Sequence, residues 1–149
     1  MDHGKGFTGD RTTAQAGTAL GKHEAVIAGY VFGSIARGDA TQLSDIDLAV
    51  LLQPAPDDEL FRTRIELLGA MAKSLGSNKV DLVVLNTAPL ALVYRVLRDG
   101  RLIYERPGRR RNRVRFEADA YVRYFDFRVL ERRIHRAMRQ RVKEGKFGG

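Results

Sequence analysis

The feature that most constrains this sequence is an apolar run that begins with two aspartates. Asp45 and Asp47 are separated by one residue and lead into the β-forming run 48–52. Side chains along a strand alternate between its two faces, so both carboxylates must point to the same side. Two adjacent anions repel each other, and burying them unpaired is costly unless a divalent cation offsets their charge. The run therefore predicts a strand whose acidic entrance lies at an edge of the fold.

Further segments complete a predicted α/β (α+β) pattern. Apolar β-formers predict strands over 25–32 and 80–85, with a shorter edge strand over 101–104. Helical spacing of apolar residues predicts a helix over 57–75, and a proline opens a short helix over 89–97. The fold class that we expect is a small mixed β-sheet flanked by helices.

The order of these segments also predicts how the strands run. Gly33 and Ser34 end the first strand, whereas the aspartate pair begins the second. If these residues share a site, the first two strands are antiparallel. The helix between the second and third strands is long enough for a crossover, which makes those two strands parallel. Asp81, near the start of the third strand, then lies at the same edge as Asp45.

The 149 residues are enough for one domain, which we divide into three parts. Residues 1–22 lack periodicity and are expected to form a flexible N-terminal extension. Residues 23–106 form the expected core. Residues 107–149 contain a linker and then a long basic amphipathic helical segment, expected to pack one face on the core. No apolar run approaches the length of about 18 residues that a membrane span needs, and the absence of cysteine fits a cytoplasmic protein.

Positive charge is concentrated near the end of the chain. Residues 1–100 carry a balance of −2, whereas residues 101–149 carry +10, and fourteen of the sixteen basic residues there are arginine. Such a segment can be a solvated helix face, a nucleic-acid patch or a docking surface for an acidic partner. Apolar residues at helical spacing favour docking to a protein, because arginine and aromatic residues are enriched in protein interfaces. We do not expect direct binding to nucleic acid.

Asp81 would supply a third carboxylate beside Asp45 and Asp47. Mg²⁺ favours a few carboxylates together with phosphate oxygens, so this edge of the sheet suits a magnesium-bound phosphate ligand. Gly33 permits a phosphate to approach the backbone closely, and Ser34 places a hydroxyl at an expected helix N-terminus. Each feature alone is more often structural, as an acidic strand entrance or an ordinary turn. Their joint position at strand ends is what predicts a site.

Two neighbouring residues have two interpretations each. Arg37 lies about one turn beyond Ser34 and could direct its guanidinium at the same phosphates, or it could pair with Asp39. Ser44 precedes the first aspartate and could orient a carboxylate, although a hydrogen bond within its own loop is the favoured interpretation. Both residues stay among the candidates for phosphate binding.

Residues 33–47 carry a motif that resembles a known signature. The glycine–serine pair, ten further residues and Asp-x-Asp resemble the signature of the polymerase-β-like nucleotidyltransferases. The residues within this motif are most similar to those of the minimal nucleotidyltransferases. Segments 80–89, 98–104 and 115–128 are similar to those of MntA-type antitoxins, the nucleotidyltransferase partners of HEPN-domain (HepT-type) toxins. The resemblance covers roughly residues 25–145.

This resemblance implies a fold, an activity and a partner. It implies the polymerase-β-like nucleotidyltransferase fold and transfer of AMP from ATP to a tyrosine of a HEPN-domain RNase toxin. The transfer neutralises the toxin in a type VII toxin–antitoxin system. By position, Gly33 and Ser34 would hold the triphosphate, with Arg37 and Ser44 as further candidates for ATP binding.

The same resemblance assigns the carboxylates. Asp45, Asp47 and Asp81 would be the catalytic and metal-binding residues for two Mg²⁺ ions, with Asp81 near the attacking hydroxyl. Two other functions stay open: an antitoxin that neutralises its toxin by binding alone, and a nucleotidyltransferase that acts on a small molecule or on RNA. The intact carboxylates argue against an antitoxin that only binds. The chain has little room for a second substrate-binding domain, which argues against an enzyme that acts on a small molecule or on RNA.

Overall fold

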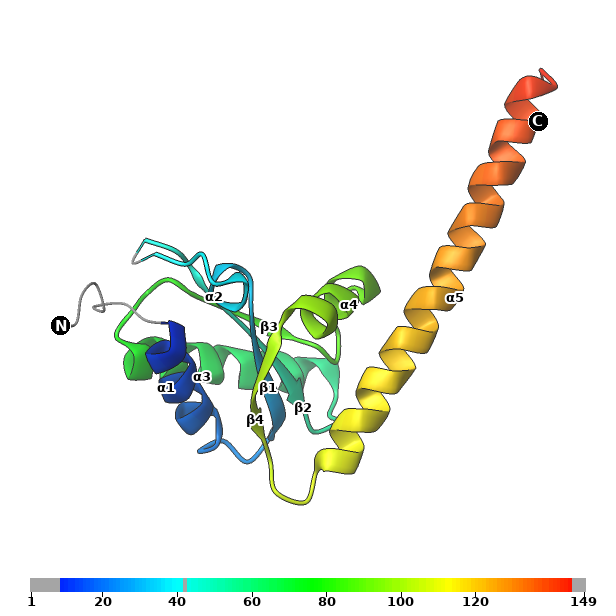
Figure 1. Ribbon diagram of the computed structural model, residues 1–149. Coiled ribbons are helices and arrows are strands. Elements are labelled where there is room, and N and C mark those ends of the chain that lie inside the picture. The colour runs from blue at the N-terminus through cyan, green and yellow to red at the C-terminus, as the bar shows by residue number, and fades with distance from the viewer. Residues whose placement is uncertain (1–8, 42, 146–149) are drawn as a thin grey trace.

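The computed structural model describes residues 9–41 and 43–145, and Figure 1 shows a sheet with helices packed around it. The sheet has four strands in the order β3-β2-β1-β4. Strand β1 is antiparallel to β2 and β4, and β2 is parallel to β3. In chain order the described elements are α1 (Gly9–Leu20), β1 (Val26–Phe32), α2 (Ser34–Arg37), β2 (Ile46–Leu52), α3 (Asp57–Leu75), β3 (Val80–Val84), α4 (Leu90–Asp99), β4 (Arg101–Glu105) and α5 (Arg110–Lys143).

The strand directions confirm the topology predicted from the sequence. Helix α3 makes the crossover between the parallel strands β2 and β3. Asp47 on β2 lies opposite Phe32 at the end of β1 and beside Asp81 on β3. The end of β1 and the starts of β2 and β3 therefore meet at one edge of the sheet, which is where the motif residues lie.

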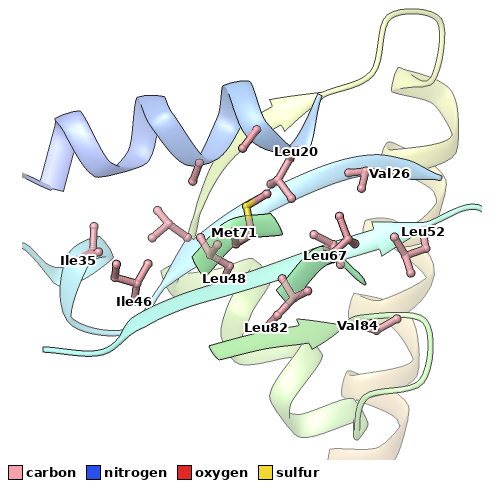
Figure 2. Close-up of a cluster of buried hydrophobic side chains, with 14 of the residues drawn as sticks. Leu20, Val26, Ile35, Ile46, Leu48, Leu52, Leu67, Met71, Leu82 and Val84 are labelled. Carbon is pink, nitrogen blue, oxygen red and sulfur yellow. The ribbon is translucent and has the colours of Figure 1, made fainter. Parts of the chain in front are cut away.

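The central strand β2 is buried on both faces. Leu48 and Leu52 lie on the face covered by α1 and α3, where they form a cluster with Leu67 and Met71 of α3 (Figure 2). Ala49 lies on the opposite face, in a second cluster with residues of α4 and of the first turns of α5. Burial on both faces explains why the sequence of this strand is continuously apolar rather than alternating.

Helix α1 corrects part of the expected flexible extension, residues 1–22. Ala16 and Leu20 of this helix are fully buried in the core. A Cβ added to Gly17 would stand 2.6 Å from the carbonyl oxygen of Ile103 on β4, so the helix packs closely on that strand. The helix is rich in small residues, which allow this packing but give little apolar periodicity, and the sequence pattern therefore missed it. The first eight residues lie outside the described part of the chain.

Helix α5 also departs from expectation. The sequence predicted that residues 107–149 pack one face on the core, but of the described residues in this helix only Ala120 is buried. Thirty-four residues make a helix of about 50 Å, whereas α4, on which it packs, has ten residues. Figure 1 shows the later turns extending away from the sheet, because the core is too short to cover them. Neither α5 nor any other described helix is apolar enough over a sufficient length to cross a membrane.

The first turns of α5 are held by a polar cluster. The hydroxyl of Tyr30, on β1, donates a 2.6 Å hydrogen bond to Glu117. Arg113 donates to Glu117 at 2.9 Å and to Glu105, on β4, at 3.3 Å. Burial, and then the hydrogen bond to Glu117, raise the pKa of Tyr30, so its hydroxyl stays a donor at neutral pH. The base of α5 is therefore fixed to two strands.

Candidate active site

The glycine that follows β1 has a backbone conformation that other residues rarely adopt. Gly33 has φ 70° and ψ −145° and precedes Ser34, the first residue of α2, as the sequence predicted. A Cβ at position 33 would collide with the Oδ2 atom of Asp47. Both the positive φ and the lack of space require glycine. The loop predicted as a phosphate cradle therefore lies directly against a carboxylate of the next strand.

Three aspartates lie at neighbouring strand starts. Asp45 precedes β2 and is exposed, Asp47 is half-buried, and Asp81 on β3 is exposed. Burial is the largest cause that raises the pKa of Asp47, and the negative charges of Asp81 and Asp45 add to it. Arg37 opposes this shift in the pKa. At Asp47, the effect of the two neighbouring carboxylates on the pKa therefore exceeds that of Arg37.

The three carboxylates suit a hard divalent cation by type and by place. Mg²⁺ prefers carboxylate oxygens and commonly completes its shell with phosphate oxygens, and Gly33 leaves the backbone open beside Asp47. A cation would also relieve the unfavourable ionisation of Asp47. Within residues 9–41 and 43–145, no three acidic or histidine side chains already surround a single point. The fit of Asp45, Asp47 and Asp81 to magnesium thus rests on donor chemistry and strand position.

Arg64, on α3, belongs to this region and was not found from the sequence. Its Nε donates a 2.8 Å hydrogen bond to the backbone carbonyl of Leu82. Its guanidinium also lies 3.9 Å from the carboxylate of Asp81. The helical spacing of α3 shows which of its residues avoid the core, but it does not show which strand an arginine reaches. The role of Arg64 therefore could not be predicted from the sequence.

Arg37 and Ser44 each form one of their two predicted interactions. Arg37 Nε lies 3.4 Å from Asp39, and both side chains are more than 60% exposed. Because an exposed ion pair is weak, Arg37 can exchange Asp39 for a phosphate at little cost. The Oγ atom of Ser44 accepts a 2.9 Å hydrogen bond from the backbone N–H of Thr41. Ser44 therefore shapes its loop in this structure.

A cleft of about 540 Å³ opens beside the glycine, a volume typical of small-molecule sites. The cleft is lined by Phe32, Gly33, Arg37, Leu92, Arg95 and Asp99. Leu92, Arg95 and Asp99 come from one face of α4, a helix that sequence analysis did not connect with the site. The sequence shows that these three residues are spaced to share one face of a helix, but no motif indicates that this face lines the cleft. Arg37 and Arg95 give the cleft two positive charges.

Two comparisons of the sequence bear on this site. Residues 15–109 match the family described as polymerase beta, nucleotidyltransferase, and that range includes every candidate site residue. The protein adenylyltransferase MntA of Aphanizomenon flos-aquae (strain 2012/KM1/D3) is 35% identical over 89 aligned residues. The alignment covers 52% of this chain and 56% of that relative, so the chain matches little more than half of the relative's length.

Solved structures share the fold. A crystal structure of a toxin–antitoxin with AMP-PNP superposes with a TM-score of 0.67 at 25% identity, over 85% of this chain and 97% of the other. A structure of the tri-AMPylated Shewanella oneidensis HEPN toxin in complex with MNT antitoxin gives a TM-score of 0.64 at 23% identity. In that case 88% of this chain and 98% of the other are covered. The mixed sheet, its flanking helices and the long last helix are thus an arrangement found in solved structures.

Proposed function

Because this chain belongs to the polymerase beta nucleotidyltransferase family, we propose that it is a protein adenylyltransferase and the antitoxin of a type VII toxin–antitoxin system. In this proposal it transfers AMP from ATP to a tyrosine of a HEPN-domain RNase toxin, and the transfer inactivates the toxin. The similar proteins support the adenylyl transfer and the HEPN-domain partner, whereas the tyrosine acceptor follows from the resemblance to MntA-type antitoxins. The chemistry is supported by the residues at the sheet edge.

The observation that carries the proposal is the order of groups across three strand ends. Gly33 follows β1, Asp47 is the second residue of β2, and Asp81 lies beside it on β3. The glycine leaves no Cβ between an approaching phosphate and the carboxylate of Asp47. A nucleotidyl transfer needs a phosphate site, carboxylates for metal and a place for the acceptor, and these strand ends offer groups for each.

The chain's own residues would bind the triphosphate in the cleft of about 540 Å³ beside Gly33. Ser34 can donate its hydroxyl to a phosphate oxygen, and the guanidinium groups of Arg37 and Arg95 line the same cleft. Ser44 supports the loop that precedes Asp45 through its bond to Thr41. These contacts position the α-phosphorus, and positioning with charge stabilisation accounts for most of the catalysis in this class of reaction.

Asp45, Asp47 and Asp81 would hold two magnesium ions, which supply charge neutralisation for the triphosphate and a lower pKa for the acceptor hydroxyl. Of the three, Asp81 lies on the strand farthest from β1 and so marks the acceptor side. Its carboxylate is held beside Arg64. The resulting proposal assigns ATP to the β1 side of the site and the acceptor to the β3 side.

The proposed docking surface for the toxin is the distal part of α5. Leu130, Ile134 and Met138 recur at helical spacing there, and each is about half exposed although apolar. Residues 101–149 carry a balance of +10, which suits an acidic partner. The chain is thus proposed to consist of a catalytic core ending near residue 106 and a docking segment. The proposed place of action is the cytoplasm, where ATP is available.

The test is a transfer assay with the purified toxin encoded beside this protein. With ATP labelled at the α-phosphate, label should appear on the toxin, and with ATP labelled at the γ-phosphate it should not. Intact mass should rise by whole AMP units, peptide mass spectrometry should locate them on tyrosine, and RNase activity should fall. Neutralisation without any transfer would identify a binding antitoxin instead. Transfer to an RNA or a small molecule but never to the toxin would likewise contradict the proposal.

A further inference from the structure

A second cleft, of about 380 Å³, lies between α3, β3 and the start of α4. Phe61 and Arg64 line it from α3, Asp81 from β3, and Thr87 and Leu92 from the turn before α4 and from α4 itself. Phe61 is 60% exposed although it is a large apolar residue. The lining of the cleft therefore includes an exposed aromatic ring and the carboxylate of Asp81.

The two clefts are neighbours, and of the three aspartates only Asp81 lines one of them, the smaller. Leu92 lines both of them, so they adjoin at α4. The larger cleft contains Gly33, at the end of β1, whereas the smaller one contains Asp81, on the outer strand β3. Asp47 lies on β2, between these two strands. A reaction that joins two substrates at Asp47 has one cleft available for each.

The walls of the smaller cleft indicate what it can hold. Most of its lining is apolar, while Asp81 and Arg64 supply a charged pair and Asp57 adds a second carboxylate. Arg64 already donates to the backbone carbonyl of Leu82, so that carbonyl is not free to pair with an added strand. The cleft therefore suits an inserted side chain rather than an extended peptide backbone. A side chain with an apolar body and one polar tip matches these walls.

We propose that this cleft is the acceptor subsite and that it takes the ring of a tyrosine of the partner protein. This inference rests on the proposed adenylyl transfer. The phenyl ring packs on Phe61, and the hydroxyl lies toward Asp81. The phenolic oxygen bonds to the α-phosphorus, the bond from that phosphorus to the bridging oxygen breaks, and its electron pair leaves with pyrophosphate. The phenolic proton is released to water.

The test compares two exposed apolar residues of α3. Phe61 lines the cleft, whereas Ile65, which is 48% exposed, does not. At saturating toxin and ATP, Phe61→Ala should slow AMP transfer about tenfold, the order expected when an aromatic contact is removed. Its affinity for ATP should stay within about twofold of wild type. Ile65→Ala should match wild type in both measurements. Equal rates for the two variants, whether both fast or both slow, would overturn the assignment.

A binding measurement separates this inference from the transfer reaction itself. The probe is N-acetyl-tyrosinamide, added to the ¹⁵N-labelled chain, with N-acetyl-alaninamide as the control. The tyrosine probe should shift the amide resonances of Arg64, Val83 and Thr87, and the alanine control should not. Absence of these shifts would overturn the subsite. If the shifts appear but the wild-type chain transfers nothing to its toxin, the proposed function fails while the aromatic subsite stands.

Discussion

The edge of the sheet and the distal part of α5 use charged and apolar residues in opposite ways. At the sheet edge, a few charged side chains project from strands that are otherwise mostly buried, and Gly33 and Asp47 fit each other without space for a Cβ. On distal α5, Leu130 and Ile134 are about half exposed and contact no core. Packing within the chain therefore explains the first region but not the second. The apolar spacing of α5 needs a surface outside this chain.

Both regions also carry unbalanced charge. Burial, and then the negative charges of Asp81 and Asp45, raise the pKa of Asp47, and the last 49 residues carry a net charge of +10. In the first region a cation and a phosphate ligand would complete the balance, and in the second an acidic protein surface would do so. The following predictions test whether the two regions serve these separate purposes.

The largest expected effect is loss of chemistry without loss of fold. The double variant Asp45→Asn, Asp47→Asn should lower AMP transfer by about a thousandfold or more, the order found when electrostatic stabilisation of a transition state is removed. Its thermal unfolding midpoint should not fall, because like charges are being removed. A radiolabelled assay measures the loss of AMP transfer, and thermal unfolding followed by circular dichroism measures the midpoint. Wild-type transfer by this variant would end the assignment of the carboxylates.

Variants at two glycines should distinguish the steric effect of an added side chain from the strain of a positive φ. Gly33→Val should weaken ATP binding about a hundredfold, or about 3 kcal/mol, measured by calorimetry. Gly76→Val is the matched control, because Gly76 also has positive φ, 63°, but a Cβ there would meet nothing within 4 Å. The control should lose about 1–2 kcal/mol of folding stability and keep its affinity for ATP. If both variants bind ATP equally, the loop is not the phosphate cradle.

On distal α5, substitutions should weaken binding of the partner and leave ATP binding unchanged. Leu130→Ser with Ile134→Ser should weaken toxin capture by about tenfold or more, the effect of removing central interface residues. The unfolding midpoint and the affinity for ATP should stay at wild-type values, because neither residue contacts the core. Capture by the wild-type chain should survive moderate salt, since screening reaches exposed charges only. Undiminished capture by the variant, or capture that disappears steeply with salt as nucleic-acid binding does, would refute the docking surface.

Where the two regions join, the expected effect is one of stability alone. Tyr30→Phe removes the 2.6 Å hydrogen bond to Glu117, which also accepts from Arg113. The free energy of unfolding should fall by about 1–2 kcal/mol, as for other part-buried hydrogen bonds to a charged group. Denaturant unfolding measures this change. No loss of stability would mean that the polar cluster does not hold the base of the helix.

The smallest expected effect is a pH-dependent gain in stability. Because the pKa of Asp47 is raised in the fold, its ionised form opposes folding at neutral pH. Asp47→Asn should therefore raise the unfolding midpoint of the metal-free protein slightly at pH 7. The gain should disappear as the pH falls below about 3.9, the ordinary aspartate value, because the wild-type carboxyl is then protonated in both states. A gain that does not depend on pH would have a cause other than charge.

The sequence predicted those parts of the fold in which a local pattern has a single physical meaning. The apolar runs had to be buried strands, the positions of Gly33 and Asp47 oriented the first two strands, and the length of the following helix oriented the third. The residue roles at this edge remain predictions that the assays above must test. The sequence missed α1 because its small residues show little apolar periodicity, although Leu20 is fully buried.

Other features were missed because they depend on distance in space. Nothing local indicates that Arg64 reaches Leu82 and Asp81, or that Arg95 lines the cleft beside β1. The expectation for α5 failed for a related reason. Periodicity shows that a helix has an apolar face, but the surface that covers that face depends on the size of the core.

The unsupported length of α5 has a consequence for the lifetime of the free chain. A helix without tertiary contacts opens readily from its end, and a protease cuts the opened form. Exposed arginines such as Arg132, Arg136 and Arg139 would each be a cleavage site for trypsin. Limited digestion should therefore shorten the chain from its C-terminal side before the sheet is attacked. A bound partner that covers the apolar stripe would slow this digestion, so the survival of full-length chain would report how much of it is in complex.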